Sequence, residues 1–155
     1  MVAVFACLVL ALPALANNGL QRKASPYSVE QTVERFEAAV RSKGLRVFPR
    51  IDHAAAAADY GLEMPPTVVI GFGNPKYGTP YMLENPQAAI DFPPRAVVYE
   101  DADGKVWLAY NSSPYLYEYL FERHGLDYPP GDIEFFNNAL ERLTDMAVGS
   151  EPIGE

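Results

Sequence analysis

The sequence predicts an α+β domain: a small, mostly antiparallel sheet whose C-terminal strands form a β-hairpin, with helices packed on it. Two patterns predict this class. Two β-rich runs flank a turn at residues 101–104, whose Gly104 supplies the positive φ that a hairpin turn needs. Segments with helical periodicity stand before and after these runs, and the chain has no internal repeat. The 155 residues fit a single domain.

The first predicted helix begins after Ser28, which precedes Gln31 by three residues, as in a capping box. Apolar residues then recur at steps of four, three and four, so one face of the helix is expected to lie on a core. Gly44 is expected to end the helix, because glycine readily adopts the left-handed conformation of a helix stop. The apolar stripe consists of Val29, Val33, Phe36 and Val40.

The next elements alternate between strand and helix. Residues 45–51 predict a short strand, and Pro49 within it predicts a sheet edge or a bulge, because proline donates no ladder hydrogen bond. A second helix is predicted from Asp52 to Tyr60, ended by Gly61. Residues 65–73 hold a β-branched run between breakers, which predicts a buried strand.

The second half of the chain begins with a proline-rich connection at 74–94, in which we expect one or two short helical turns. The hairpin at 95–111 follows. A third helix is predicted to begin with Pro114 at its first position and to end at Gly125. The last helix is predicted from Asp132 to Ala147. Its apolar face consists of Ile133, Phe136, Leu140 and Leu143.

Residues 1–16 are uncharged and apolar and end in Ala-Leu-Ala, the pattern that signal peptidase recognises. They are shorter than the roughly 20 apolar residues of a spanning helix, although a retained N-terminal anchor is the alternative. Cleavage of this signal peptide would remove Cys7, the only cysteine, and leave no disulfide. We therefore expect a periplasmic or secreted protein with a linker at 17–27, one α+β domain at 28–147 and a flexible tail at 148–155.

The chain is acidic, with twelve Lys and Arg against twenty Asp and Glu and a net charge of −8. The basic residues are scattered, and no basic stripe with interleaved aromatic residues is present to neutralise phosphates. This pattern argues against nucleic acid as a partner, and against a membrane surface once the signal segment is removed. The acidity itself favours solubility.

Four short motifs occur in order along the chain: Ile-Asp-His-Ala at 51–54, Phe-Gly-Asn-Pro-Lys at 72–76, Asp-Phe-Pro at 91–93 and Asp-Gly-Lys at 103–105. With these motifs, residues 28–143 resemble the bacterial family of domains of unknown function 302. The resemblance implies a compact α+β domain, frequently dimeric, that occurs in exported and cytoplasmic settings. It implies no agreed catalytic residues.

Asp52 and His53 stand directly before five alanines. Asp52 fits the N-cap of the second helix, which places His53 at the first helical position. There the helix dipole disfavours imidazolium, and a neutral imidazole can ligate a metal or a haem iron, or act as a base. The alanines leave room beside the helix for a ligand or a second subunit. The alternative is a structural histidine on a closely packed helix.

A second candidate site lies at the turn after the predicted buried strand. Asn74 and Lys76 offer polar groups beside the apolar body of Tyr77, a mixture that is typical of small-ligand clefts. No Walker pattern accompanies the glycines of this turn, so a phosphate-cradling loop is not indicated. We expect this turn, together with Asp91 of the third motif and His53, to line one ligand cleft.

Several kinds of chemistry are not supported by any motif. His124, the only other histidine, precedes a predicted helix stop, where it complements the dipole. The two histidines form no zinc motif, and no CxxCH sequence attaches haem. No GxSxG elbow is present, and the acidic residues show no spacing that singles out a glycosidase pair.

The leading hypothesis is an exported small-ligand-binding or interaction domain that forms a homodimer, with no catalysis and no cofactor evident. One alternative is a haem-binding redox protein with His53 as axial ligand. Another is a structural homodimer in which the aromatic stretch at 115–121 forms the contact.

Overall fold

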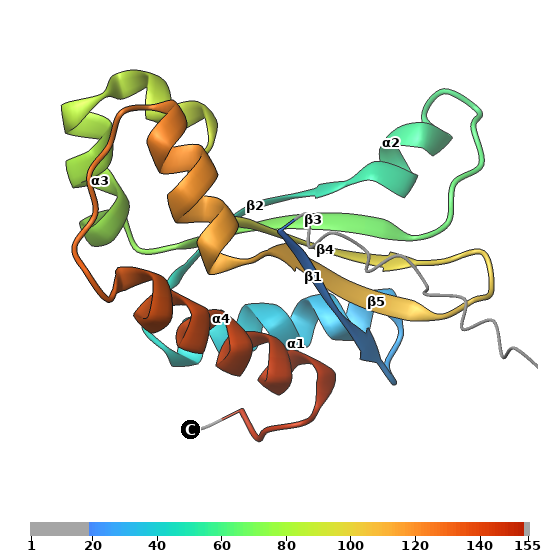
Figure 1. Ribbon diagram of the computed structural model, residues 1–155. Helices are drawn as coiled ribbons and strands as arrows, with labels where there is room; N and C mark the ends of the chain where they lie inside the picture. Colours follow the sequence, from blue (N-terminus) through green and yellow to red (C-terminus); the bar gives the residue numbers. More distant parts are fainter. Residues whose placement is uncertain (1–18, 154–155) are drawn as a thin grey trace, which may run out of the picture.

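Five antiparallel strands form a single sheet in the spatial order β1-β5-β4-β3-β2 (Figure 1). The computed structural model describes residues 19–153 of the chain. Strands β2 to β5 follow one another as a meander, and β1 pairs with the far side of β5, so β1 and β2 are the two edges. The predicted α+β class is confirmed. The strands are β1 Leu20–Ser25, β2 Arg46–Asp52, β3 Thr67–Gly73, β4 Arg95–Glu100 and β5 Val106–Asn111.

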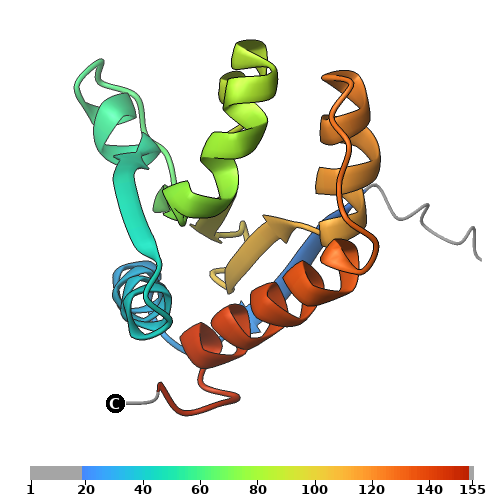
Figure 2. The same ribbon diagram turned by 90° about the vertical axis from the view of Figure 1, so that its left-hand side faces the viewer.

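The helical segments lie on both sides of the sheet (Figures 1 and 2). Helices α1 and α4 lie against one face, the covered face, which carries Ile70, Val98 and Leu108. Helix α2 stands above one end of the other face, and α3 and η2 stand above its opposite end. This second face, the open face, carries Val69, Val97 and Trp107. The helical segments are α1 Val29–Ser42, α2 His53–Ala58, α3 Pro75–Glu84, the 3₁₀-helix η1 Pro86–Ile90, the π-helix η2 Tyr115–Phe121 and α4 Asp132–Val148.

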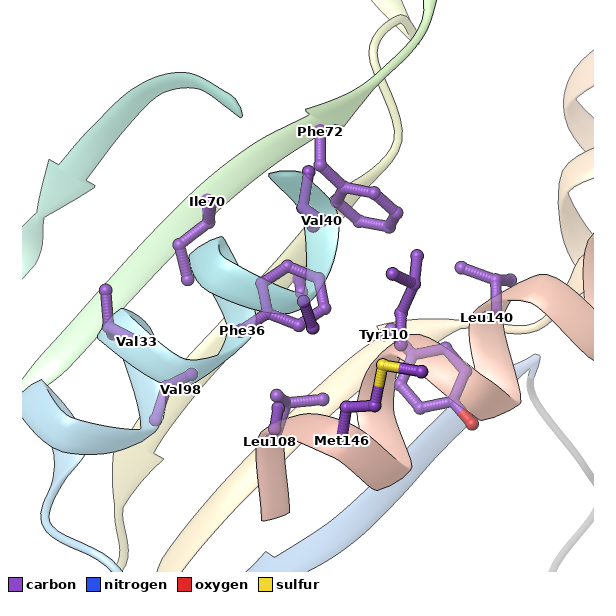
Figure 3. Packing of buried hydrophobic residues seen from close by; sticks show 14 of the residues in the cluster. Val33, Phe36, Val40, Ile70, Phe72, Val98, Leu108, Tyr110, Leu140 and Met146 are labelled. Carbon is purple, nitrogen blue, oxygen red and sulfur yellow. The ribbon is translucent and has the colours of Figure 1, made fainter. Parts of the chain in front are cut away.

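The core lies between the covered face and helices α1 and α4 (Figure 3). The predicted capping box of α1 is confirmed: the Ser28 hydroxyl accepts a hydrogen bond from the Gln31 N–H, and the Gln31 side chain accepts one from the Ser28 N–H, both at 3.2 Å. The four residues of the predicted stripe are buried. Phe36 meets Phe72 of β3 edge to face, with ring centroids 5.1 Å apart. The side chain of Leu140 extends this core along α4.

The predicted hairpin is confirmed, with Glu100 of β4 opposite Val106 of β5. Its turn is held by Asp101, whose carboxylate accepts hydrogen bonds from two backbone N–H groups and from the indole N–H of Trp107 at 2.7 Å. The hydrogen bond from Trp107, followed by those from the backbone, lowers the pKa of Asp101. Gly104 adopts a φ of 75°, which a residue with a side chain would rarely take.

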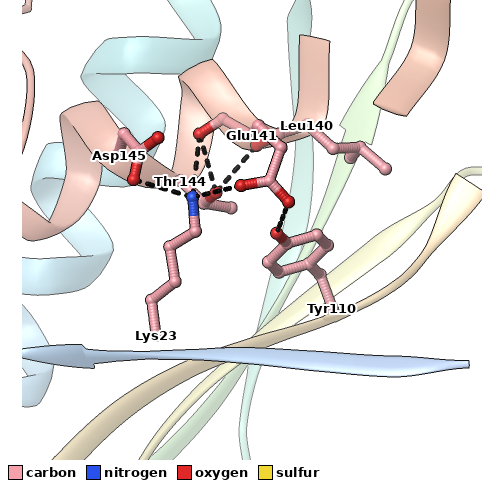
Figure 4. Close-up of polar contacts among 6 residues, drawn as sticks. All are labelled: Lys23, Tyr110, Leu140, Glu141, Thr144 and Asp145. Atoms are coloured by element: carbon pink, nitrogen blue, oxygen red, sulfur yellow. Dashed lines mark hydrogen bonds and ion pairs between the residues drawn. The ribbon is translucent and has the colours of Figure 1, made fainter. Parts of the chain in front are cut away.

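A polar network joins β1 and β5 to α4 on the covered face (Figure 4). Lys23 Nζ lies 2.7 Å from a carboxylate oxygen of Glu141 and 2.7 Å from one of Asp145. Tyr110 donates a hydrogen bond to the other oxygen of Glu141 at 2.8 Å. Partial burial alone would raise the pKa of Glu141, but the hydrogen bonds from Lys23 and Tyr110 outweigh it and hold the pKa below its usual value. Burial raises the pKa of Tyr110, which keeps its phenol protonated as a donor.

The expected linker at 17–27 is in part a strand. Leu20 lies opposite Asn111 and Ser25 opposite Val106, so β1 pairs with β5 along its whole length. The segment alternates, but with polar residues on both faces, and it therefore lacks the apolar alternation by which a strand is recognised. Its inward polar groups are satisfied on the covered face, as the network around Lys23 illustrates.

The proline-rich connection contains more helix than predicted. The Asn74 side chain accepts a hydrogen bond from the Lys76 N–H at 3.0 Å, and Pro75 occupies the first position, where its missing N–H costs nothing. The result is a ten-residue helix, with Pro80 in its interior, followed by the 3₁₀-helix η1. The predicted edge strand is present as β2, one residue later at each end than predicted, and its register shifts between Val47 and Arg50, around Pro49.

The remaining predicted helices are present with some differences. Helix α2 ends at Ala58 and not at Tyr60. The third predicted helix ends as expected near Gly125, but its central part is a π-helix. In the expected tail, Ile153 packs against the core. The predicted signal segment lies outside the described residues.

Within residues 19–153, no helix combines the length and the apolar character that crossing a bilayer requires.

Candidate functional site

Asp52 and His53 occupy the positions that the sequence predicts for them. Asp52 caps α2 and accepts a hydrogen bond from the Ala55 N–H at 2.9 Å, and His53 is the first helical residue. The surroundings differ from the expectation. The imidazole is exposed, and no side chain of α2 is buried. The alanines therefore form neither a tight contact with the sheet nor the wall of either cavity described below.

The single cleft expected from His53, Asn74 and Asp91 is not formed. Asp52 lies opposite Val68 at the start of β3, whereas Asn74 follows the end of β3. The five residue steps between Val68 and Gly73 correspond to about 16 Å at the 3.3 Å rise of a strand. His53 and the Asn74 turn thus lie at opposite ends of the sheet, because antiparallel pairing carries the chain from one end to the other.

Asp91 is engaged in a contact that the sequence did not predict. Its carboxylate lies 2.6 Å from Nε2 of His124, and both side chains are largely buried. Arg123 approaches the same oxygen at 3.4 Å. The Asn85 side chain donates a hydrogen bond to the backbone oxygen of His124 at 3.0 Å. These contacts join η1 to the end of the helix that contains η2, so Asp91 holds two segments together.

An aromatic cluster fills the space between α3, η2 and the start of α4. Phe121 lies at its centre, with ring centroids 4.6 Å from Tyr81, 4.6 Å from Tyr117 and 5.9 Å from Phe92. Burial, and then the nearby carboxylate of Asp132, raise the pKa values of Tyr81 and Tyr117. Both phenols therefore stay protonated at neutral pH, and their rings pack within the cluster.

The aromatic stretch at 115–121 contributes to this cluster instead of forming an outward face. Tyr117 and Phe121 point inward and are buried, together with Leu116. Tyr115 stacks on Tyr119, and of these two only Tyr119 is exposed. Most of the surface that the dimer alternative requires is thus used within the chain.

A cavity of about 480 Å³ opens at the end of the sheet where β2 begins and β3 ends. Figure 2 faces this end of the molecule. The cavity is lined by Arg41 in the last turn of α1, by residues 44–47 with Arg46, and by Asn74 and Pro75 at the start of α3. Of the residues predicted to bind a ligand, Asn74 lines this cavity, and Lys76 and Tyr77 follow it in the first turn of α3.

Two arginines, Arg41 and Arg46, make the lining of this cavity positively charged, and we call the region around it the basic corner. Arg41 pairs with Glu37, one helical turn earlier, at 2.8 Å. Arg46 forms no ion pair within residues 19–153. The first N–H groups of α3 are already used: those of Lys76 and Tyr77 bond to Asn74, and Pro75 has none. A ligand in this cavity would therefore meet guanidinium groups and an amide side chain, not free backbone donors.

A second cavity, of about 370 Å³, lies between η2 and the loop that follows it. Tyr117 and Tyr128 supply its aromatic surface, and Glu118, Glu122 and Asp127 supply carboxylates. No group of three or more His, Cys, Asp or Glu side chains within the described residues is arranged to hold a metal ion. His53, the expected haem ligand, lines neither cavity.

The profile of the family "Domain of unknown function DUF302" matches residues 21–146. The chain belongs to the DUF302 family. A crystal structure of an uncharacterised conserved DUF302 protein from Bacillus stearothermophilus is similar, with a TM-score of 0.64 and 16% identity over 85% of this chain and 97% of that chain. At this identity the similarity establishes the DUF302 fold alone.

Two curated relatives of this DUF302 chain come from Brucella. "Fluoride-specific ion channel FluC 1" of Brucella suis biovar 1 is 41% identical over 115 residues, which are 74% of this chain and 44% of the relative. "Fluoride-specific ion channel FluC 2" of Brucella melitensis biotype 1 is also 41% identical over 115 residues, or 41% of its own length. The chain thus spans less than half the length of these relatives.

Sequence reasoning missed two features of this DUF302 chain, one in the basic corner and one outside it. In the sequence Arg41 and Arg46 are two of the scattered basic residues, although they flank a turn that leads into β2. Antiparallel pairing of the neighbouring strands β2 and β3 brings the start of β2 next to the Asn74 turn after β3. The order of the predicted strands could therefore have indicated this site. The pairing of Asp91 with His124 had no such signal, since 33 residues separate them and neither lies in a paired strand.

Proposed function

We propose that this DUF302 chain is a non-catalytic binding domain for small oxyanions, and that the basic corner formed by Arg41, Arg46 and Asn74 is its binding site. The observation that supports this function is the cavity of about 480 Å³ with two arginines in its lining. A guanidinium group presents a rigid fork of N–H donors that matches a carboxylate or a phosphate.

The charge distribution supports an anion as the ligand. The chain carries eight more acidic than basic residues, which repels anions at most of its surface. At this corner the balance is reversed, because Lys43 and Lys76 lie in the segments adjacent to the two arginines and Glu37 is already paired with Arg41. Arg46 is therefore left to bind an anion, and Asn74 can donate through its amide nitrogen.

The Brucella relatives add support of a different kind. Proteins named as fluoride-specific ion channels contain a segment 41% identical to this chain. In our proposal such a segment binds an anion beside a membrane protein that handles anions. With the predicted signal segment, the same domain would carry out this binding in the periplasm or outside the cell.

Isothermal titration of the purified chain tests the proposal, with sodium phosphate, sodium acetate and sodium fluoride as titrants at constant ionic strength. We expect saturable binding of phosphate or acetate. Binding should raise the free energy of unfolding by about 2.7 kcal/mol at a ligand concentration of 100 times Kd, which a thermal shift detects. Arg46→Gln should abolish both effects, because it removes the unpaired guanidinium. Arg142→Gln, which changes an exposed arginine of α4, is the matched control and should bind like wild type.

Three results would contradict this function. One is that none of the three anions gives heat or a thermal shift at millimolar concentration. Another is that Arg46→Gln and Arg142→Gln weaken binding equally, which would indicate a general effect of net charge. Binding of fluoride alone would also reject an oxyanion site.

A further inference from the structure

The cavity of the basic corner is larger than an inorganic oxyanion requires. Its volume is about 480 Å³. The five heavy atoms of a phosphate ion would fill only about 150 Å³ at the roughly 30 Å³ that a water molecule occupies in the liquid. Clefts that enclose a whole small organic molecule have volumes of roughly 300–1,000 Å³. The size of the cavity therefore favours a ligand with a body attached to its anionic group.

The lining of the cavity provides apolar surface for such a body. Its apolar side chains are those of Leu45, Val47 and Pro75. Leu45 and Val47 are partly buried and pack against the core cluster, so the fold holds them in place. Pro75 is exposed at the first position of α3 and has no N–H group to donate. A ligand in this cavity thus meets apolar surface beside the guanidinium groups.

The polar groups of the lining can satisfy few ligand oxygens. The N–H groups of Gly44 and Leu45 already donate to carbonyl oxygens of α1, at 3.0 and 3.2 Å. The Asn74 side-chain oxygen accepts the Lys76 N–H, which leaves the amide nitrogen as its donor. With the Arg46 guanidinium, this nitrogen can serve the two oxygens of a carboxylate. Phosphate sites commonly use several free backbone N–H groups as well.

The charge of the lining favours a single negative charge on the ligand. Arg41 is already paired with Glu37 at 2.8 Å. Arg46 is the lining guanidinium that forms no ion pair in the part of the chain that the structure describes. Lys43 and Lys76 are exposed and lie outside the lining, where salt screens their charges. One unpaired guanidinium matches a monoanion better than a phosphate group, which carries about −1.5 to −2 charges at pH 7.

We infer that the basic corner binds an organic monocarboxylate with a short apolar chain. The carboxylate accepts forked hydrogen bonds from Arg46 and a further one from the amide nitrogen of Asn74. The chain lies against Leu45, Val47 and Pro75, where it is removed from water. This inference rests on the proposed oxyanion function and narrows its ligands to one class, in which an apolar body supplies part of the affinity.

Isothermal titration of the full chain with sodium acetate, butanoate and hexanoate tests the inference, with sodium phosphate for comparison and at constant ionic strength. Full burial of one methylene group strengthens binding by about fourfold. Because the cavity opens to solvent, we expect hexanoate to bind at least about tenfold more tightly than acetate, and more tightly than phosphate. Hexan-1-ol has the same chain without the charge and should show no saturable binding.

Variants of the apolar lining test where the chain lies. Val47→Thr keeps a β-branched residue in β2 and adds a hydroxyl group, and it should lower the ratio of hexanoate to acetate affinity at least about threefold. Pro75→Ala, at an exposed position, tests the same wall if Val47→Thr does not fold. Ile51→Thr changes an exposed residue of the same strand outside the lining and is the matched control, with a wild-type ratio. Circular dichroism checks the fold of each variant.

The outcomes distinguish this inference from the proposed function. If acetate and phosphate bind through Arg46 but hexanoate binds no more tightly than acetate, the oxyanion site stands and the monocarboxylate inference is overturned. If none of the anions binds, both are overturned. A gain with chain length that persists in Arg46→Gln, or that neither Val47→Thr nor Pro75→Ala reduces, would place the apolar chain outside the basic corner and overturn the inference.

Discussion

Helices α1 and α2 begin in the same way but differ in how much of each is buried. Each starts at a side-chain cap, Ser28 for α1 and Asp52 for α2, that accepts a hydrogen bond from a backbone N–H in the first turn. Six side chains of α1 are buried, whereas α2 buries none. A cap therefore specifies where a helix begins, and the apolar stripe decides whether the helix joins the core.

Length and composition account for the difference. Helix α1 has 14 residues and a regular apolar stripe, so it is stabilised by packing. Helix α2 has six residues and five alanines, and alanine has the highest helix propensity of all residues. A helix this short is marginal without tertiary contacts, which makes α2 sensitive to whatever lies against it.

The largest effect is expected in the core below α1. Phe36→Ala should lower the free energy of unfolding by about 3–5 kcal/mol, because Phe36 is fully buried against Phe72. Urea denaturation followed by circular dichroism measures this loss. A value below about 1 kcal/mol would mean that α1 and the sheet do not share one cooperative core.

The two caps provide the next comparison. Ser28→Ala should cost about 1 kcal/mol of global stability, the usual effect of losing a helix cap. Asp52→Ala should leave global stability nearly unchanged and increase hydrogen exchange in residues 54–58 alone, because α2 unfolds locally without exposing core. Equal losses of global stability in both variants would contradict the distinction between the helices.

A smaller, pH-dependent effect is expected on the covered face. A carboxylate whose pKa is lowered on folding contributes stability above its unfolded pKa, near 4.3, and loses it as the pH falls through the folded value. Glu141→Gln should therefore flatten the decline of stability between about pH 5 and pH 3. The contribution is modest, since the side chain is 43% exposed. Glu118→Gln, on the surface of η2, is the matched control and should retain the wild-type slope.

The smallest effect on the free energy of unfolding is expected in the exposed segment between β2 and β3. Leu62→Ser should change it by less than about 0.5 kcal/mol in dilute protein, since the leucine makes no core contact. Thermal denaturation across a range of protein concentrations measures this and exposes any contribution from association. A loss comparable to that of Phe36→Ala at every concentration would place Leu62 inside the monomer's core.

Features that are set by residues close together in the sequence could be predicted, whereas contacts between residues far apart in the sequence could not. Three such local features are found where the sequence predicts them. They are the capping box at Ser28, the hairpin turn that contains Gly104 and the helix cap at Asp52. The cleft expected between His53 and the Asn74 turn is not formed, because the antiparallel strands β2 and β3 place these residues at opposite ends of the sheet. Strand β1 was missed because its inward groups, such as Lys23, are polar and are satisfied only by α4.

Trp107 is the only tryptophan of the chain, and it lies on the open face in contact with two cationic side chains, Arg22 and Lys105. Its indole is half-buried and responds to the polarity of whatever covers this side of the sheet. The tryptophan emission of the protein thus comes from a single indole on this face of the sheet. A shift of the tryptophan emission maximum would report a change of polarity at the open face, so the molecule carries its own optical probe of whatever covers that face.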